Sequence, residues 1–170
     1  KPSVATEFAK ALKVPTGRKN GYLEGEDIIV TWCVGHLVTM SYPEKYDERL
    51  KRWSLDTLPF LPKEFKYEII DGVKAQFAID AVKAQYKTVS ALLNRDDVNC
   101  IYICTDSGRE GEYIYRLVDM MAKVEGKIRK RVWIDSQTEE EILRGIREAK
   151  DWSHYDNLSS AAFLRAKEDY

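Results

Sequence analysis

The sequence lacks a long apolar segment, an excess of charge of one sign and a secretory signal. Its 170 residues carry 27 Lys and Arg against 28 Asp and Glu, for a formal net charge of −1. A basic signature for nucleic acid over the whole chain is therefore absent. The apolar runs are far too short to cross a membrane, so we expect a cytoplasmic protein that has no membrane partner.

Cysteine is scarce, and the few cysteines form no metal-binding motif. Cys33, Cys100 and Cys104 are odd in number, and no two of them stand in a C-x-x-C pair. This spacing excludes the usual zinc sites. We expect three buried, reduced thiols, as is usual in the cytosol.

Apolar and aromatic residues are plentiful. The hydrophobic fraction is 44%, with 4 Trp and 10 Tyr, which argues against a disordered chain. Basic residues gather locally, at residues 10–19 and 127–131. Such clusters either bind phosphates or form solvated turns, and the sequence leaves both readings open.

The apolar pattern predicts strands and helices in alternation. Ser3 is a candidate N-cap for the first helix, and Thr138 with Glu141 forms a candidate capping box for a later one. Alternation over residues 65–150 favours a parallel sheet covered by helices on both faces. The predicted elements are a helix from residue 4, a strand at 28–34, an irregular surface excursion at 42–64, a strand at 65–70, a helix at 73–93, a strand at 99–104, a helix from 111, a strand at 132–134, a helix to 150 and a helix at about 158–170.

An apolar strand that ends in an aspartate is the most informative part of the sequence. The run Ile101 to Cys104 leads to Asp106, and Arg109 and Glu110 then open a helix. In open α/β sheets, sites form beyond the carboxyl ends of the strands. Two carboxylates this close repel each other unless a cation lies between them. Mg²⁺ accepts a few carboxylates, keeps waters and uses phosphate oxygens, while Arg109 suits a phosphate. The stretch predicts a Mg²⁺ site for phosphoryl transfer on a nucleic-acid backbone.

Two other interpretations of the same residues remain open. Asp106 and Glu110 would also serve simply to cap the helix, because carboxylates favour helix N-termini. Asp106 could instead accept a phosphoryl group, but that chemistry needs further acids and a Lys at later strand ends. Lys130 or Asp135 would have to serve, and neither is well placed.

Five segments, in the family's order, resemble motifs of the type IA DNA topoisomerases and favour the topoisomerase III branch. They are Lys1 to Ser3 (E-K-P-S without its Glu), residues 32–37 (W-C-x-G-H-L), residues 52–62 (R-W-x-L-x-x-L-P-x-x-P), residues 105–112 (T-D-x-D-R-E-G-E) and residues 163–170 (R-A-R-A-D-W). Two departures matter. The Glu of the first motif would precede Lys1, and Gly108 stands where the family has the second Asp of D-x-D, which leaves few carboxylates for a metal.

The resemblance implies a Toprim fold, an α/β Rossmann-like parallel sheet flanked by helices, with a β-hairpin and loop excursion. Residues 1–150 would form this domain, whose first strand would lie upstream of Lys1. Residues 151–170 would be a helix that begins the next topoisomerase domain. The family breaks one DNA strand through a tyrosine, passes another strand through the gap and rejoins the first, with Mg²⁺ and without ATP. That tyrosine belongs to a later domain, so we assign no nucleophile here and expect the chain alone to be inactive.

The resemblance also implies roles and partners. Asp106 and Glu110 would bind Mg²⁺, Glu110 would assist proton transfer, and Lys1 would stabilise charge on the phosphate. The partners would be single-stranded DNA and the remaining domains of the same polypeptide, in a monomeric, nucleoid-associated bacterial protein. The residues expected to contact DNA are Arg109, Trp53, Arg165 and Tyr170.

Two alternative functions remain. Toprim domains of primases and nucleases share the acidic motif, but they would not be expected to carry the segments at 32–37 and 52–62. A non-catalytic nucleic-acid-binding module with a degenerate metal site would explain Gly108. His36 has no identifiable partner in the sequence, so we interpret it as a hydrogen-bonded residue at a strand end rather than a functional one.

Overall fold

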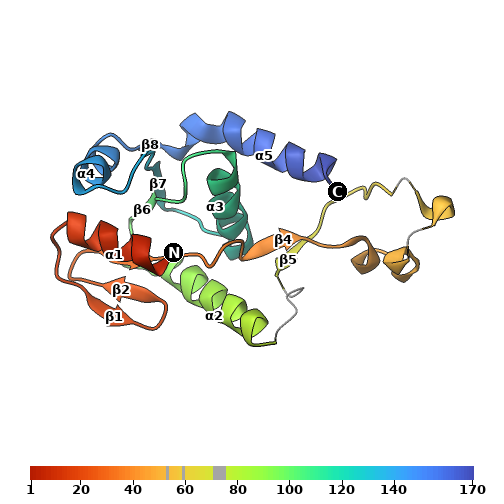
Figure 1. The fold of residues 1–170 in the computed structure, drawn as a ribbon, viewed down its shortest axis with the longest axis horizontal. Helices are drawn as coiled ribbons and strands as arrows, with labels where there is room; N and C mark the ends of the chain where they lie inside the picture. Colours follow the sequence, from red (N-terminus) through yellow and green to blue (C-terminus); the bar gives the residue numbers. More distant parts are fainter. Residues whose placement is uncertain (53, 59, 71–75) are drawn as a thin grey trace.

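The chain folds into helices packed around three small β-sheets (Figure 1). A computed structural model describes residues 1–52, 54–58, 60–70 and 76–170. In chain order, the helices and strands of this part are α1 (Pro2–Ala11), β1 (Gly17–Lys19), β2 (Tyr22–Glu24), β3 (Ile29–Thr31), β4 (Val38–Met40), β5 (Tyr67–Ile69), α2 (Gln76–Leu93), β6 (Cys100–Ile103), α3 (Arg109–Ala122), β7 (Ile128–Arg131), α4 (Glu139–Arg147), β8 (Lys150–Asp151) and α5 (Asp156–Glu168).

The three sheets differ in strand direction. β1, β2 and β3 form an antiparallel sheet, and β4 pairs with β5, also antiparallel. In the third sheet β6 and β7 are parallel, and β8 returns antiparallel to β7. The predicted parallel sheet is thus confirmed for β6 and β7, but the sheet as a whole is mixed.

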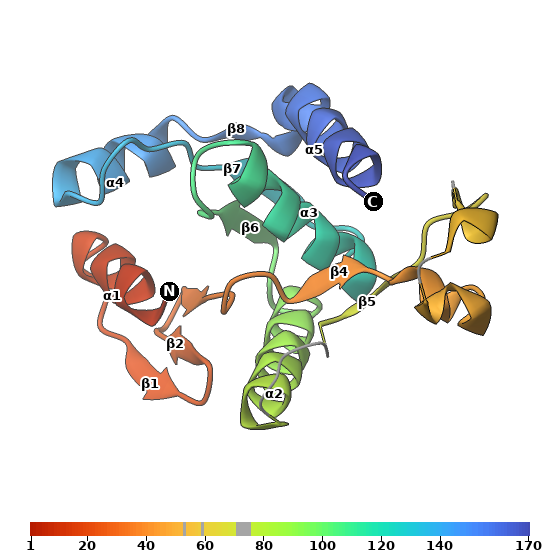
Figure 2. The same ribbon diagram turned by 45° about the vertical axis from the view of Figure 1, so that its right-hand side comes forward.

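Helices cover both faces of the third sheet, as the alternating pattern predicted. On one face Ile101 and Ile103 of β6 join a buried cluster with residues of α2, α3 and β4. On the other face Val132, which directly follows β7, packs with Phe8 of α1 and Ile142 of α4. Figure 2 shows α1 and α4 on one side of the sheet and α2 and α3 on the other.

The strand predicted at 132–134 is displaced. β7 covers Ile128–Arg131, which reads Ile-Arg-Lys-Arg. Such a sequence does not look like a buried strand, because three of its four residues carry a charge, and a charge inside the protein must be paired. Its two arginines are paired: Arg129 Nε lies 3.0 Å from Asp119 of α3, and Arg131 Nε lies 2.7 Å from Glu112 of the same helix.

The helix ends also differ in detail from the prediction. Lys1, rather than Ser3, is the N-cap of α1, and Pro2 takes the first helical position, where its missing N–H costs no hydrogen bond. Thr138 caps α4 as predicted, with its hydroxyl accepting from the Glu141 N–H. In the described part of the chain the second half of the capping box is absent, because the Glu141 carboxylate pairs with Arg144 and accepts from the Asp135 N–H instead. Helix α4 ends at Arg147 rather than at residue 150.

The predicted excursion is confirmed and projects from the body of the molecule (Figure 1). It contains three short 3₁₀ turns, at Pro43–Lys45, Glu48–Lys51 and Leu55–Thr57. An aromatic cluster holds its base against the end of the chain. This cluster consists of Tyr46, Phe60, Phe65 and Tyr170.

The last helix packs against α3 (Figure 2). Its Phe163 ring lies edge-on to Tyr113 of α3, at 5.1 Å between centroids, and 6.2 Å from the ring of Tyr67 in β5. The adjacent Leu164 points to solvent, with 58% of its surface exposed. Within the described ranges no helix has the length and apolar character that a membrane span requires.

Phe163→Ala is expected to lower the free energy of unfolding by about 2–3 kcal/mol, because it empties the aromatic contact between α5 and α3. Leu164→Ala is the matched control, one residue away on the exposed face, and should change stability little. Urea denaturation monitored by tryptophan fluorescence compares the two. Equal losses would mean that α5 is not held by the Phe163 face.

Candidate active site

The turn from β6 into α3 carries the predicted acidic residues. Asp106 lies in the turn, and Arg109 and Glu110 form the first turn of α3. All three residues are exposed, so the carboxylates are open to a cation and to a phosphate. This is the edge of the sheet at which ligands bind in open α/β folds.

A fully buried guanidinium is hydrogen-bonded to the backbone of this turn. Arg131 is 0% exposed, and its Nη1 donates to the carbonyls of Ile103, Thr105 and Val132 at 3.2, 2.8 and 3.0 Å. Its Nη2 donates to the Asp106 carbonyl at 2.8 Å. The several N–H donors of one guanidinium make these bonds. They fix the backbone just beyond β6, including the peptide of Asp106.

Glu112 balances the charge of Arg131. Its carboxylate is also 0% exposed, with Oε2 at 2.7 Å from Arg131 Nε and Oε1 at 2.9 Å from Arg116 Nε. Burying a charge costs several kcal/mol unless it is paired and hydrogen-bonded, and here each carboxylate oxygen has a cationic donor. Glu112 was part of the acidic motif in the sequence, but nothing there distinguished its structural role from that of Glu110.

Gly111 lets the turn fold back onto the helix. A Cβ added at this position would lie 1.8 Å from the carbonyl oxygen of Asp106, far inside van der Waals contact. Only glycine permits so close a backbone approach. Ser107 completes the attachment, because its hydroxyl donates to the Ile134 carbonyl at 2.8 Å and accepts from the Ile134 N–H at 3.0 Å.

Gly108 has a backbone conformation that favours glycine. It is the N-cap of α3 with φ 139° and ψ 176°, a region that residues with a side chain rarely adopt. No atom of the described residues lies within 4 Å of a Cβ placed there. The position that holds an acid in the family motif is therefore open in space but strained for an Asp.

Glu110 has a partner that the sequence did not reveal. His36 Nε2 is hydrogen-bonded to Glu110 Oε1, across 74 residues of sequence. The interpretation of His36 as a hydrogen-bonded residue holds, but its partner is a predicted catalytic and metal-binding residue. The only signal for this contact was that both residues lie in segments that resemble motifs of one family.

The oxygen donors at this turn are of the type that binds a hard cation, but they are few. Asp106 and Glu110 offer carboxylate oxygens, the ligands that Mg²⁺ prefers. In the part of the chain that the structure covers, no three His, Cys, Asp or Glu side chains gather closely enough to hold a metal. One buried polar atom beside the turn, the Thr105 hydroxyl, has no hydrogen-bond partner among the residues that the structure describes. A metal held here would keep several waters or take oxygens from a phosphate.

Lys1 and the predicted DNA-contacting residues have different surroundings. Lys1 is exposed at the start of α1, and Val4 in the next turn packs in the same cluster as Cys104, two residues before Asp106. Arg165 is exposed and paired with Asp169 at 2.9 Å. Trp53 lies outside the described residues.

Tyr170 is half-buried at the base of the excursion. Its hydroxyl donates to the Ser41 carbonyl at 2.8 Å, and its ring lines a small cavity of about 50 Å³ beside Arg52 and Phe60. Burial raises the pKa of Tyr170 to about 12, and burial likewise raises the pKa of Tyr113 to about 12. A raised pKa disfavours the phenolate form of both residues.

Three of the four basic residues at 127–131 are engaged within the protein. Lys127 donates to the carbonyls of Arg95 and Val98, and Arg129 and Arg131 are paired with acids of α3. Of the cluster at 10–19, Lys10 and Lys13 pair with Glu7 and Glu139 at the surface, while Arg18 and Lys19 are exposed on the β1–β2 hairpin.

The three cysteines are free thiols, as expected, but they are half-buried rather than fully buried. Burial raises the pKa of Cys33 to about 11 and that of Cys104 to about 12. Both thiols therefore stay protonated near neutral pH and are poor nucleophiles.

Glu112→Ala is expected to lower the free energy of unfolding by about 3–5 kcal/mol, since it leaves the buried Arg131 charge without its carboxylate. Glu148→Ala, which removes the exposed partner of Arg144, is the control and should leave stability nearly unchanged. Chemical denaturation of both variants provides the measurement. A Glu112 variant as stable as the control would show that the pair does not hold the turn.

Gly111→Ala is expected to lower stability by about 3 kcal/mol, because the new methyl group must displace the Asp106 backbone. Gly17→Ala is the control; within the described ranges an added Cβ there meets only the Glu24 carbonyl oxygen, at 3.9 Å. Amide chemical shifts of residues 105–110 should move in the first variant and stay in place in the second. Unchanged shifts in Gly111→Ala would contradict the close approach.

Comparison with known proteins connects this turn to a family. The sequence matches the family described as Toprim domain over residues 1–136. It is 44% identical over 170 residues to "DNA topoisomerase 3" of Bacillus cereus (strain ATCC 14579), an alignment that covers all of this chain and 22% of that protein. It is 43% identical to proteins of the same name from Bacillus anthracis and, over 172 aligned residues, from Staphylococcus aureus (strain USA300), with the same coverage.

The resemblance to the topoisomerase III branch is confirmed by these relatives, although the chain spans only 22% of their length. The Toprim match includes β6, the acidic turn and α3. Together with the α/β architecture and its parallel strand pair, this match shows that the chain belongs to the Toprim domain family.

Proposed function

We propose that this chain is the Toprim portion of a type IA DNA topoisomerase of the topoisomerase III kind. In this proposal the whole protein breaks, passes and rejoins single DNA strands with Mg²⁺ and without ATP. The observation that carries the proposal is the exposed Asp106–Glu110 turn, whose backbone is hydrogen-bonded to the buried Arg131. Identity of 43–44% over the whole chain to proteins named "DNA topoisomerase 3" supports it.

The chain's own residues would divide the work at the turn. Asp106 and Glu110 would hold Mg²⁺, whose positive charge, when the ion is bound, would offset the negative charge of the phosphate. Glu110 would also move a proton at the scissile phosphate. Lys1, exposed at the start of α1, would stabilise the negative charge that develops on the phosphate oxygens.

DNA contacts would extend from the turn toward the excursion. Arg109 is exposed beside Glu110, and Arg165 is exposed on α5, so both are available to a phosphate backbone. Tyr170 and Arg52 border one small cavity, and an aromatic ring beside a guanidinium suits a base of single-stranded DNA. Trp53 would add a second stacking surface.

The extent of the domain is part of the proposal. We take residues 1–150 as the Toprim domain, completed by a strand that would precede Lys1, and residues 151–170 as the start of the next domain. The relatives are far longer than this chain, so the remaining domains, including one that carries the nucleophilic tyrosine, would be partners within the same polypeptide. The protein would be monomeric, cytoplasmic and associated with the nucleoid.

A second candidate is a nucleic-acid-binding module without catalysis. It is favoured by Gly108, whose backbone conformation is unfavourable for the acid of the family motif. It also agrees with the low number of carboxylates close together in the described part of the chain. Metal binding at Asp106 and Glu110 separates the two candidates, because only the first needs it.

Asp106→Asn and Glu110→Gln are each expected to weaken Mn²⁺ binding by about tenfold or more, since a site with few carboxylates depends on each of them. Asp96→Asn is the control, an exposed acid outside the turn. Water proton relaxation during a Mn²⁺ titration, followed by competition with Mg²⁺, measures the affinities. Identical affinities for the two site variants and the control would favour the non-catalytic module.

A further inference from the structure

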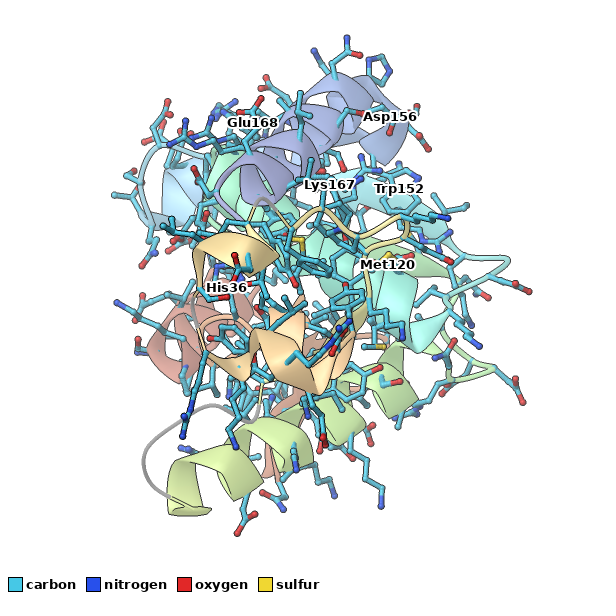
Figure 3. All side chains as sticks on the ribbon, turned by 90° about the vertical axis from the view of Figure 1, so that its right-hand side faces the viewer. His36, Met120, Trp152, Asp156, Lys167 and Glu168 are labelled. Carbon is cyan, nitrogen blue, oxygen red and sulfur yellow. The ribbon has the colours of Figure 1, made fainter. Side chains whose placement is uncertain are left out.

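His36 is held in a fixed position next to the acidic turn. It lies between β3 and β4 (labelled in Figure 3), and the next two residues, Leu37 and Val38, are each only 1% exposed in the main core. Its ring lies edge-on to Tyr113, at 6.0 Å between centroids. Tyr113 is itself held by Phe163 of α5. The buried residues that follow His36 fix its backbone, and the Tyr113 ring restricts its imidazole.

The Glu110 side chain, in contrast, is largely surrounded by solvent. Its side chain is 74% exposed, against 32% for His36, and it projects from the first turn of α3. An exposed Glu side chain samples several rotamers, and fixing it for binding costs rotamer entropy. The hydrogen bond from His36 Nε2 to Oε1 restricts those rotamers before any ligand arrives, while the carboxylate stays accessible.

We propose that His36 is a positioning residue for Glu110: its Nε2–H donates to one carboxylate oxygen and orients the carboxylate toward the cation site at the turn. The proposal rests on the proposed function of Glu110 as a metal ligand. His36 does not itself touch the metal or the DNA in this account. It acts through Glu110, as hydrogen-bonded partners orient ligating carboxylates in metal sites.

The pairing can be tested without a metal, because the chain has only two histidines, His36 and His154. His154 is exposed on the turn before α5 and serves as an internal reference. Long-range ¹H–¹⁵N spectra of the imidazole rings should show His36 protonated at Nε2 and hydrogen-bonded. Glu110→Ala should shift the His36 Nε2 resonance and leave both nitrogens of His154 in place. An unmoved His36 resonance would overturn the pairing.

The positioning role is tested by Mn²⁺ affinity. His36→Leu should weaken Mn²⁺ binding by about three- to tenfold, the effect of releasing one rotamer-rich side chain. His36→Gln should restore most of the affinity, because its amide can still donate to Glu110. His154→Gln is the matched control and should bind as the unmodified chain does. Thermal unfolding of all three variants should coincide, which separates positioning from stability.

The outcomes distinguish this inference from the proposed function. Equal affinity in His36→Leu and the unmodified chain, or no recovery in His36→Gln, would contradict the positioning role while the metal site stands. If Mn²⁺ binding to the unmodified chain does not depend on Asp106 or Glu110, the proposed function fails. The imidazole spectra then decide the pairing by themselves.

Discussion

The acidic turn depends on one buried ion pair, between Arg131 of β7 and Glu112 of α3. Arg131 donates to three backbone carbonyls at and beyond the end of β6, including that of Asp106, and to the Val132 carbonyl that follows β7. Without Glu112, its charge would stand unpaired in an interior from which water is excluded. The pair therefore joins β7 to the turn and helix that follow β6, and it fixes the backbone that carries the Asp106 carboxylate.

The same principle extends along β7 and α3. Arg129, two residues before Arg131, pairs with Asp119, and the Arg116 and Arg129 guanidiniums lie 4.2 and 4.6 Å from the Trp152 ring. Figure 3 shows Trp152 near the Asp156 end of α5, and Arg116 also contacts Asp156. The polar layer between the sheet and α3 thus also holds the start of the last helix, which in turn packs Phe163 against Tyr113 beside His36.

Sequence patterns predicted the features that depend on local chemistry. The strand before Asp106, the helix after it, the Thr138 cap and the excursion follow from apolar periodicity, capping and turn residues, and all are confirmed. The location of β7 did not follow, because apolar periodicity cannot indicate that Arg129 and Arg131 are neutralised by acids on a helix. The pairing of His36 with Glu110 joins residues 74 positions apart, and no local pattern encodes such a contact.

The proposed cation site has few carboxylates, stands on a well-anchored turn and would be completed by solvent or by a phosphate backbone. Gly111 and Arg131 supply the rigidity, and the exposure of Asp106 and Glu110 supplies access. The most direct measurement is an anomalous difference map from crystals of the chain soaked in Mn²⁺. The account predicts a peak within bonding distance of oxygens of Asp106 and Glu110. A map with no peak at the turn, or with the ion bound elsewhere, would contradict it.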